Sequence, residues 1–264
     1  MPTSSFASGV RMPAIFVGHG SPMNAIEDNA FHRSWGDLGR RLPRPKSGLC
    51  ISAHWETHGV ALTAMAAPKT IHDFYGFPQA LFDVRYPASG DPALARRAAS
   101  LLSALNPVLD TEWGLDHGAW SVLIAMYPKA DIPVVQLSID TNKPGAYHYA
   151  IGRALKPLRD EGVLILGSGN IVHNLRLFDF RSSATPEWAV RFDAIVKERI
   201  AADAHDDLVA FEAMGADARI AIPTAEHYLP LLYVLGAQDP EERAAFFNET
   251  VISAISMTSV VIGA

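Results

Sequence analysis

The sequence predicts an α/β fold in which helices flank both faces of a central sheet that is mixed or mostly parallel. Short apolar or β-branched runs of strand length alternate along the chain with segments of helical spacing. Of the 264 residues, 49% are hydrophobic and 19% are charged, which allows a sizeable core and excludes an intrinsically disordered chain. No Pro-, Gly- or Ser-rich linker divides the sequence, so we expect residues 1–264 to form a single domain.

The predicted strands are runs rich in Val, Ile, Leu and Ala that are too short for a typical helix. In chain order they cover residues 14–17, 49–53, 61–65, 133–139, 163–166, 219–222 and 257–262. The segments between them repeat apolar residues at helical spacing, and the predicted helices cover residues 31–42, 92–105, 119–127, 146–159, 186–214 and 225–235. The second of these begins with Asp91 and Pro92 as cap and first turn, and 186–214 is long enough for two helices.

The charge balance excludes several kinds of partner. The net charge is -6, and no dense Lys/Arg run offers a surface for nucleic acid or an anionic membrane. A small-molecule partner is therefore expected.

The start of the chain lacks a basic segment followed by an apolar one, and no apolar run reaches the roughly 18 residues that span a bilayer. We expect a cytoplasmic protein whose single Cys50, in "GLCISAHW", packs in the core.

Several of the ten histidines share one context, because each stands just beyond an apolar strand in a Gly- or Ser-containing loop. His19 follows "AIFVG", His54 follows "LCISA" and His173 follows "VLILGSGNIV". In α/β sheets, ligands bind at the carboxyl ends of strands, so three strands would bring these imidazoles to one edge. Neutral imidazole is a common ligand of Fe, Zn and Cu. The sequence therefore predicts a metal site, with His227 after "RIAIPTAE" as a fourth candidate.

The stretch "FVGHGSPMNAIED" (16–28) places one of these histidines between two glycines. Flanking glycines let the backbone bend sharply and let another group approach closely. Three other motifs are excluded. "HWETH" (54–58) has Trp55 where a zinc-protease helix needs Glu, and "GSGNIV" (167–172) lacks the third glycine of a dinucleotide-binding loop. Neither Ser21 nor Ser168 stands in the Gly-x-Ser-x-Gly sequence of a serine hydrolase.

Seven motifs, taken together, resemble one enzyme family. They are "GHGSPMN" (18–24), "SAHW" (52–55), "IHDFYGFP" (71–78), "GLDHGAW" (114–120), "PVVQLSID" (133–140), "GSGNIVHNL" (167–175) and "EHYLPLLYVLGA" (226–237). In this order they resemble the class III extradiol ring-cleavage dioxygenases, and within them the single-subunit 4,5-DOPA dioxygenase extradiol group. The match spans nearly the whole chain, although residues 176–218 carry nothing diagnostic.

The resemblance implies a single catalytic domain that uses non-haem Fe(II) and O₂ to open a catechol such as L-DOPA, giving a muconic semialdehyde-type product. A facial set of three protein ligands suits this chemistry, because the catecholate and O₂ need the remaining positions. His19 and His54 are the first ligands we expect. By resemblance His173 is the base or a fourth ligand, and His117 hydrogen-bonds substrate or O₂; a histidine near its free pKa of about 6.5 can serve as acid or base.

The third ligand is either Glu226 or His227, since ring-cleaving relatives in the family use a glutamate. We expect both residues on a helix, where neighbours point about 100° apart, so only one of them faces the metal. Tyr228, Leu231 and Leu235 lie on the buried stripe, which turns His227 inward. His227 is thus the predicted ligand, with Glu226 at the helix start as the alternative.

A histidine-rich site also suits zinc, which binds nitrogen ligands more tightly than Fe(II) does, so Zn(II) is expected to occupy the site in some preparations. The alternative function is therefore a zinc-dependent hydrolase or metal-binding protein using the same histidines. Around the site, we predict a pocket rim at His72 and Tyr75 and a carboxylate-binding role for Arg176. The sequence leaves the oligomeric state open. His32, His148 and His205, on amphipathic helices, are expected in surface or packing roles, and His58 is expected in a loop.

Overall fold

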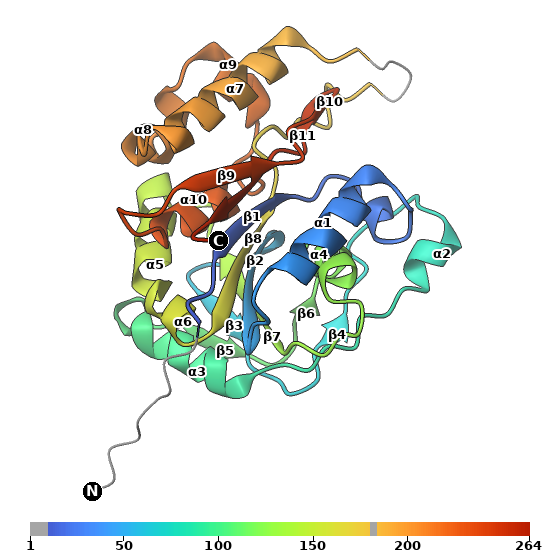
Figure 1. Cartoon of the computed structure of the whole chain (residues 1–264), viewed down its shortest axis with the longest axis vertical. Helices are drawn as coiled ribbons and strands as arrows, with labels where there is room; N and C mark the ends of the chain where they lie inside the picture. Colours follow the sequence, from blue (N-terminus) through green and yellow to red (C-terminus); the bar gives the residue numbers. More distant parts are fainter. Residues whose placement is uncertain (1–9, 180–183) are drawn as a thin grey trace, which may run out of the picture.

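The computed structural model describes residues 10–179 and 184–264. At its centre lies an eight-stranded sheet in the order β5-β3-β7-β2-β8-β1-β12-β9 (Figure 1). Its strands are β1 (Ala14–Gly18), β2 (Ser47–Glu56), β3 (Ala61–Thr63), β5 (Val108–Asp110), β7 (Val134–Ile139), β8 (Val163–Gly169), β9 (Ala244–Phe247) and β12 (Ser259–Ile262). Two further pairs are formed by β4 (Lys69–Thr70) with β6 (Gly114–Leu115) and by β10 (Val251–Ile252) with β11 (Ile255–Ser256).

Four central strands, β7, β2, β8 and β1, run parallel to one another, whereas β12 pairs antiparallel with both β1 and β9, and β3 pairs antiparallel with β7. The prediction of a mixed or mostly parallel sheet is confirmed. Side chains alternate between the faces: Ala14 and Phe16 of β1 join one buried cluster, while Ile15 and Val17 join the other. Both faces are thus buried, which explains why the strands are apolar throughout.

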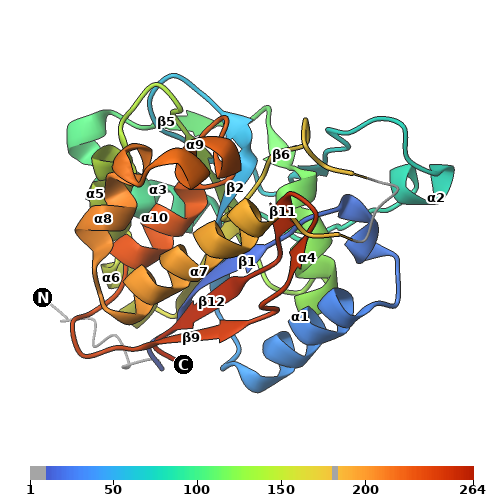
Figure 2. The same cartoon turned by 90° about the horizontal axis from the view of Figure 1, so that it is seen from above.

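Helices cover both faces, as predicted (Figures 1 and 2). On one face pack α1 (Ala30–Arg41) and α4 (His117–Met126). On the other pack α3 (Pro92–Leu101), α5 (Gly145–Leu155), α7 (Glu187–Ala201) and α10 (Leu229–Gly236). The shorter helices are η1 (Pro22–Ala25), α2 (Gln79–Phe82), η2 (Ser103–Leu105), α6 (Pro157–Asp160), α8 (His205–Val209), η3 (Phe211–Ala213) and α9 (Ala216–Ala221).

The structure corrects several expected elements. The predicted strand 219–222 is wrong, because this run belongs mainly to α9, in which Ala218 and Ala221 are buried three residues apart. A short apolar run cannot be assigned to helix or strand by its pattern alone. The long segment 186–214 divides into α7, α8 and η3, with a break at Asp203 (φ 54°). The sequence does not predict the edge strands β5 and β9, which are short and partly exposed.

Cys50 is buried at 1% exposure, which confirms its packing role. Within residues 10–179 and 184–264, no helix combines the length and apolar character needed to cross a membrane.

Candidate active site

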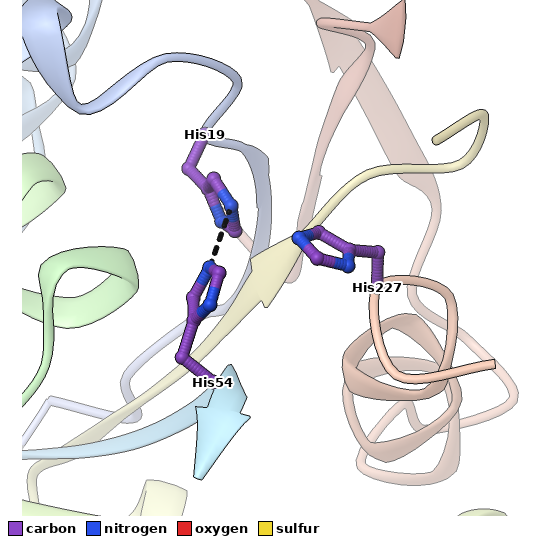
Figure 3. A group of neighbouring side chains, drawn as sticks. All are labelled: His19, His54 and His227. Carbon is purple, nitrogen blue, oxygen red and sulfur yellow. Dashed lines mark hydrogen bonds between the residues drawn. The ribbon is translucent and has the colours of Figure 1, made fainter. Parts of the chain in front are cut away.

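Three histidines converge beyond the carboxyl ends of the parallel strands (Figure 3). His19 directly follows β1, His54 lies near the end of β2, and His227 lies in the turn before α10. One ring nitrogen of each lies within 4.8 Å of those of the other two, and His19 Nε2 is 3.2 Å from His54 Nε2. The structure therefore brings together His19, His54 and His227, three of the four predicted metal ligands.

The glycines beside His19 let the loop pack closely. A Cβ on Gly18 would lie 2.7 Å from the backbone carbon of Met257, too close for any other residue without a shift of the backbone. Gly20 has φ +59°, a left-handed conformation that favours glycine, and a Cβ there would meet Met257 Sδ at 2.5 Å. The Gly-His-Gly sequence thus lets the backbone on both sides of His19 pack against Met257, just before β12.

The His54 side chain is directed by an irregularity in β2. The pairing of β2 with β7 shifts between Ile51 and Glu56, as at a β-bulge, which changes the aim of a side chain. The start of α4 then approaches this ring closely, because a Cβ on Gly118 would lie 2.8 Å from His54 Cδ2.

The hydrogen bonds made by the Nδ1 atoms assign the tautomers of His19 and His227. Ser168 Oγ donates to the carbonyl of Gly118 at 2.6 Å, so its contact of 2.9 Å with His19 Nδ1 must be one in which the ring donates. Glu226 Oε1 lies 3.1 Å from His227 Nδ1, and a carboxylate only accepts. We therefore assign the ring proton to Nδ1 in both histidines, which leaves each Nε2 with a free lone pair.

His54 differs, because its Nδ1 lies 3.5 Å from Asp73 Oδ2, an ion-pair distance without a hydrogen bond. Its Nε2 lies 3.2 Å from the unprotonated Nε2 of His19, to which it can donate, so these two nitrogens face each other at the centre of the group. Metal-ligating histidines characteristically donate their other N–H to an outer acceptor, so this donor set fits a metal ion.

Burial keeps these imidazoles neutral. It lowers the pKa of His19 and of His227 well below the ordinary value, and neighbouring imidazoles lower both further. For His54, burial and the adjacent His117 lower the pKa to about 3 despite the opposing charge of Asp73. All three imidazoles are therefore neutral, with one ring proton each, at neutral pH, and the neutral form is the one that binds a metal.

Glu226 and His227 lie in a turn rather than on a helix, because α10 begins only at Leu229. The expectation that helical geometry separates them is wrong in its premise. What distinguishes them is bonding: Glu226 Oε1 accepts from Thr224 Oγ1 at 2.8 Å and faces His227 Nδ1. The carboxylate also lies within 4.8 Å of His173 and His227, so it belongs to the site's surroundings.

His173 follows β8 and forms an isolated bridge with Ile255. Its ring stacks on that of His227, with centroids 3.4 Å apart and planes at 9°, but it falls outside the group of nitrogens formed by His19, His54 and His227. Burial lowers the pKa of His173 to about 4, against a smaller opposing effect of Glu226. This pKa is below the free value of about 6.5 expected for an acid or base, because burial disfavours the charged form of the ring.

His117 is the first residue of α4, and the side chain of Asp116 caps that helix by accepting the N–H of Ala119 at 3.1 Å. Its ring lies 3.9 Å from that of His54, centroid to centroid. His117 Nδ1 also lies 2.9 Å from Asp73 Oδ2.

Asp73 was not among the site residues predicted from the sequence. Its place in "IHDFYGFP", where it is a lone acid among aromatic residues, is the signal that could have indicated a role in the site.

The remaining predicted residues lie away from the three-histidine group. Tyr75 is 92% exposed and His72 Nε2 lies 3.0 Å from the carbonyl of Val84. Arg176 is exposed, and its proposed contact with a substrate carboxylate stays a prediction. The four histidines expected in surface, packing or loop roles bond elsewhere: His32 to Asn24, His58 to Asn142, His148 to Tyr233 and His205 to Tyr149.

Comparison with known proteins identifies the family. The pattern described as the catalytic LigB subunit of aromatic ring-opening dioxygenase matches residues 12–261. The chain belongs to this family. It is 51% identical to the 4,5-DOPA dioxygenase extradiol of Escherichia coli K12, over 97% of this chain and 96% of the relative. Another relative with that name, from Beta vulgaris, is 38% identical over 89% and 90% of the two chains.

A crystal structure of an uncharacterized protein from Escherichia coli K12 has the same fold, with a TM-score of 0.84 and 46% identity over 96% of this chain and all of that one. The LigB family membership makes this chain an extradiol-type aromatic ring-opening dioxygenase, and the resemblance drawn from the motifs is confirmed.

The Ser168→Ala substitution is expected to weaken metal binding about 10- to 100-fold, because His19 loses the acceptor that orients its ring. Ser121→Ala is the matched control, since Ser121 Oγ is buried without a partner among the described residues. Competition with a chelator measures both affinities. Equal affinity in the two variants would show that Ser168 does not support His19.

Proposed function

We propose that this chain, acting as one catalytic domain, opens the ring of a catechol such as L-DOPA with O₂ beside the two hydroxyl groups. The product would be a muconic semialdehyde. The observation that carries this proposal is the set of three imidazoles whose ring nitrogens converge between His117 and His173. Catechol specificity is supported by the LigB relatives, several of which are named for 4,5-DOPA.

His19, His54 and His227 would hold the metal through Nε2, with hydrogen-bond acceptors for the Nδ1 protons of His19 and His227 and the Asp73 carboxylate 3.5 Å from His54 Nδ1. Bound Fe(II) would supply a redox-active centre with open positions for the catecholate and O₂, and Zn(II) would fit the same nitrogens without redox activity. Three neutral ligands add no negative charge, so the site attracts an anionic catecholate.

His173 is proposed as the base that takes a catechol proton. Its imidazole is neutral and can accept a proton. The ring stacks on His227 and lies outside the group of converging nitrogens, and this position favours the role of base over that of a fourth ligand. His117 lies on the other side, against His54, and would hydrogen-bond the substrate or O₂. Phe74, whose ring centroid is 5.6 Å from that of His117, supplies an apolar wall beside it.

Oxygen consumption tests this function. Protein loaded anaerobically with Fe(II) should consume O₂ when L-DOPA is added, whereas the zinc-loaded protein should not. The 3-O-methyl derivative of L-DOPA is the matched substrate control, because it cannot present two ionised oxygens to a metal. Fe(II)-loaded protein that consumes no O₂ with any catechol, or a zinc form that hydrolyses ester or amide substrates, would favour the zinc-dependent hydrolase instead.

A further inference from the structure

Among residues 10–179 and 184–264, Asp73 is the one carboxylate that contacts both a proposed metal ligand and His117. It lies in the segment between β4 and α2, and its side chain is 18% exposed. Its Oδ2 is 2.9 Å from His117 Nδ1 and 3.5 Å from His54 Nδ1. Its Oδ1 accepts the backbone N–H of His117 at 2.9 Å.

These contacts fix both the position and the tautomer of His117. A carboxylate only accepts, so this contact is one in which His117 Nδ1 donates, and among the two neutral tautomers it selects the one whose Nε2 is an acceptor. The backbone bond ties the same carboxylate to the start of α4, so that the ring and its acceptor cannot separate without moving the helix. Two-point bonding of this kind locks an imidazole in one orientation.

Helix capping does not account for this arrangement. Asp116 already caps α4 through Ala119, and it is held by Ser52 Oγ at 2.7 Å. The second oxygen of Asp73 is therefore available for the imidazole. Asp83, ten residues further along the chain and just after α2, illustrates the contrast, because it is exposed and its carboxylate accepts from Gln79 Nε2.

We propose that Asp73 is a positioning residue that holds His117 in the Nδ1–H tautomer, so that His117 Nε2 accepts a hydrogen bond from a hydroxyl of the substrate. The His54 ring, 3.9 Å away, is aligned by the same carboxylate. The catalytic part of this inference rests on the proposed function; the tautomer does not, because it follows from the bonding of the resting protein.

The first test is ¹⁵N NMR of histidine-labelled, metal-free protein. In the wild type, the His117 ring should show the Nδ1–H pattern. In Asp73→Asn the amide can donate toward Nδ1, so the ring should switch to Nε2–H. Asp73→Glu, which keeps the charge, should restore the Nδ1–H form, and Asp83→Asn should leave it unchanged. An unchanged His117 pattern in Asp73→Asn would overturn the proposal.

The second test is turnover of the Fe(II)-loaded variants with L-DOPA. Asp73→Asn should lower kcat by about 10²-fold or more, the loss typical of a misplaced proton-transfer group, with KM less affected and metal content unchanged. Loss of metal would overturn the proposal by assigning Asp73 to His54 rather than His117. If the wild type turns over no catechol, the proposed function fails while the NMR result still decides the role of Asp73.

Discussion

His227→Ala is expected to lose its metal and with it all ring opening, whereas Glu226→Gln is expected to retain both the metal and most of the activity. Alanine removes one of three converging nitrogens and leaves Glu226 without its imidazole donor. Glutamine keeps the shape of Glu226, and its amide oxygen can still accept from His227 Nδ1. Metal analysis after gel filtration measures retention.

Far-UV circular dichroism serves as the control for folding, because site loops contribute less to stability than strand packing does. His19→Ala should behave like His227→Ala. Metal loss in Glu226→Gln together with retention in His227→Ala would reverse the assignment and restore a site of two histidines and one carboxylate.

His173→Ala is expected to keep its metal and to lose about 10² to 10⁴-fold in kcat, the contribution typical of a group that transfers a proton in the transition state. The ring lies outside the three-nitrogen group, so its removal leaves the proposed ligands in place. Steady-state kinetics with L-DOPA, alongside metal analysis, measures both effects.

His58→Ala is the matched control, because His58 is exposed and its Nδ1 lies 3.4 Å from Asn142 Nδ2, away from the site. A kcat within about threefold of the wild type in His173→Ala would refute the role of base. Loss of metal in the same variant would instead make His173 a fourth ligand.

The sequence predicted that His19, His54 and His173 lie at one edge of the sheet because one rule covers them, although the nitrogens that converge are those of His19, His54 and His227. Each follows an apolar run, and β2, β8 and β1 are adjacent parallel strands whose carboxyl ends meet at one edge of the sheet. Local pattern and sheet topology agree here, so inference from the residues alone succeeds.

His227 and Asp73 could not be placed in this way. The run before His227 is helical, and His227 reaches the site because α10 packs against the sheet, a tertiary contact that no local pattern encodes. Asp73 lies in a loop, where position depends on the packing of neighbouring elements. The choice between Glu226 and His227 likewise depends on the hydrogen bonds that Glu226 accepts from Thr224 and His227, which the helical pattern did not indicate.

The product of a single turnover tests the central claim most directly. Fe(II)-loaded protein is mixed anaerobically with L-DOPA, one equivalent of O₂ is added, and borohydride traps the aldehyde before it can cyclise onto the amine. Mass spectrometry should then show a ring-opened product with two oxygen atoms added per molecule and the former aldehyde reduced to an alcohol. An unopened quinone, or a ring-opened diacid with no reducible aldehyde, would contradict extradiol cleavage at this site.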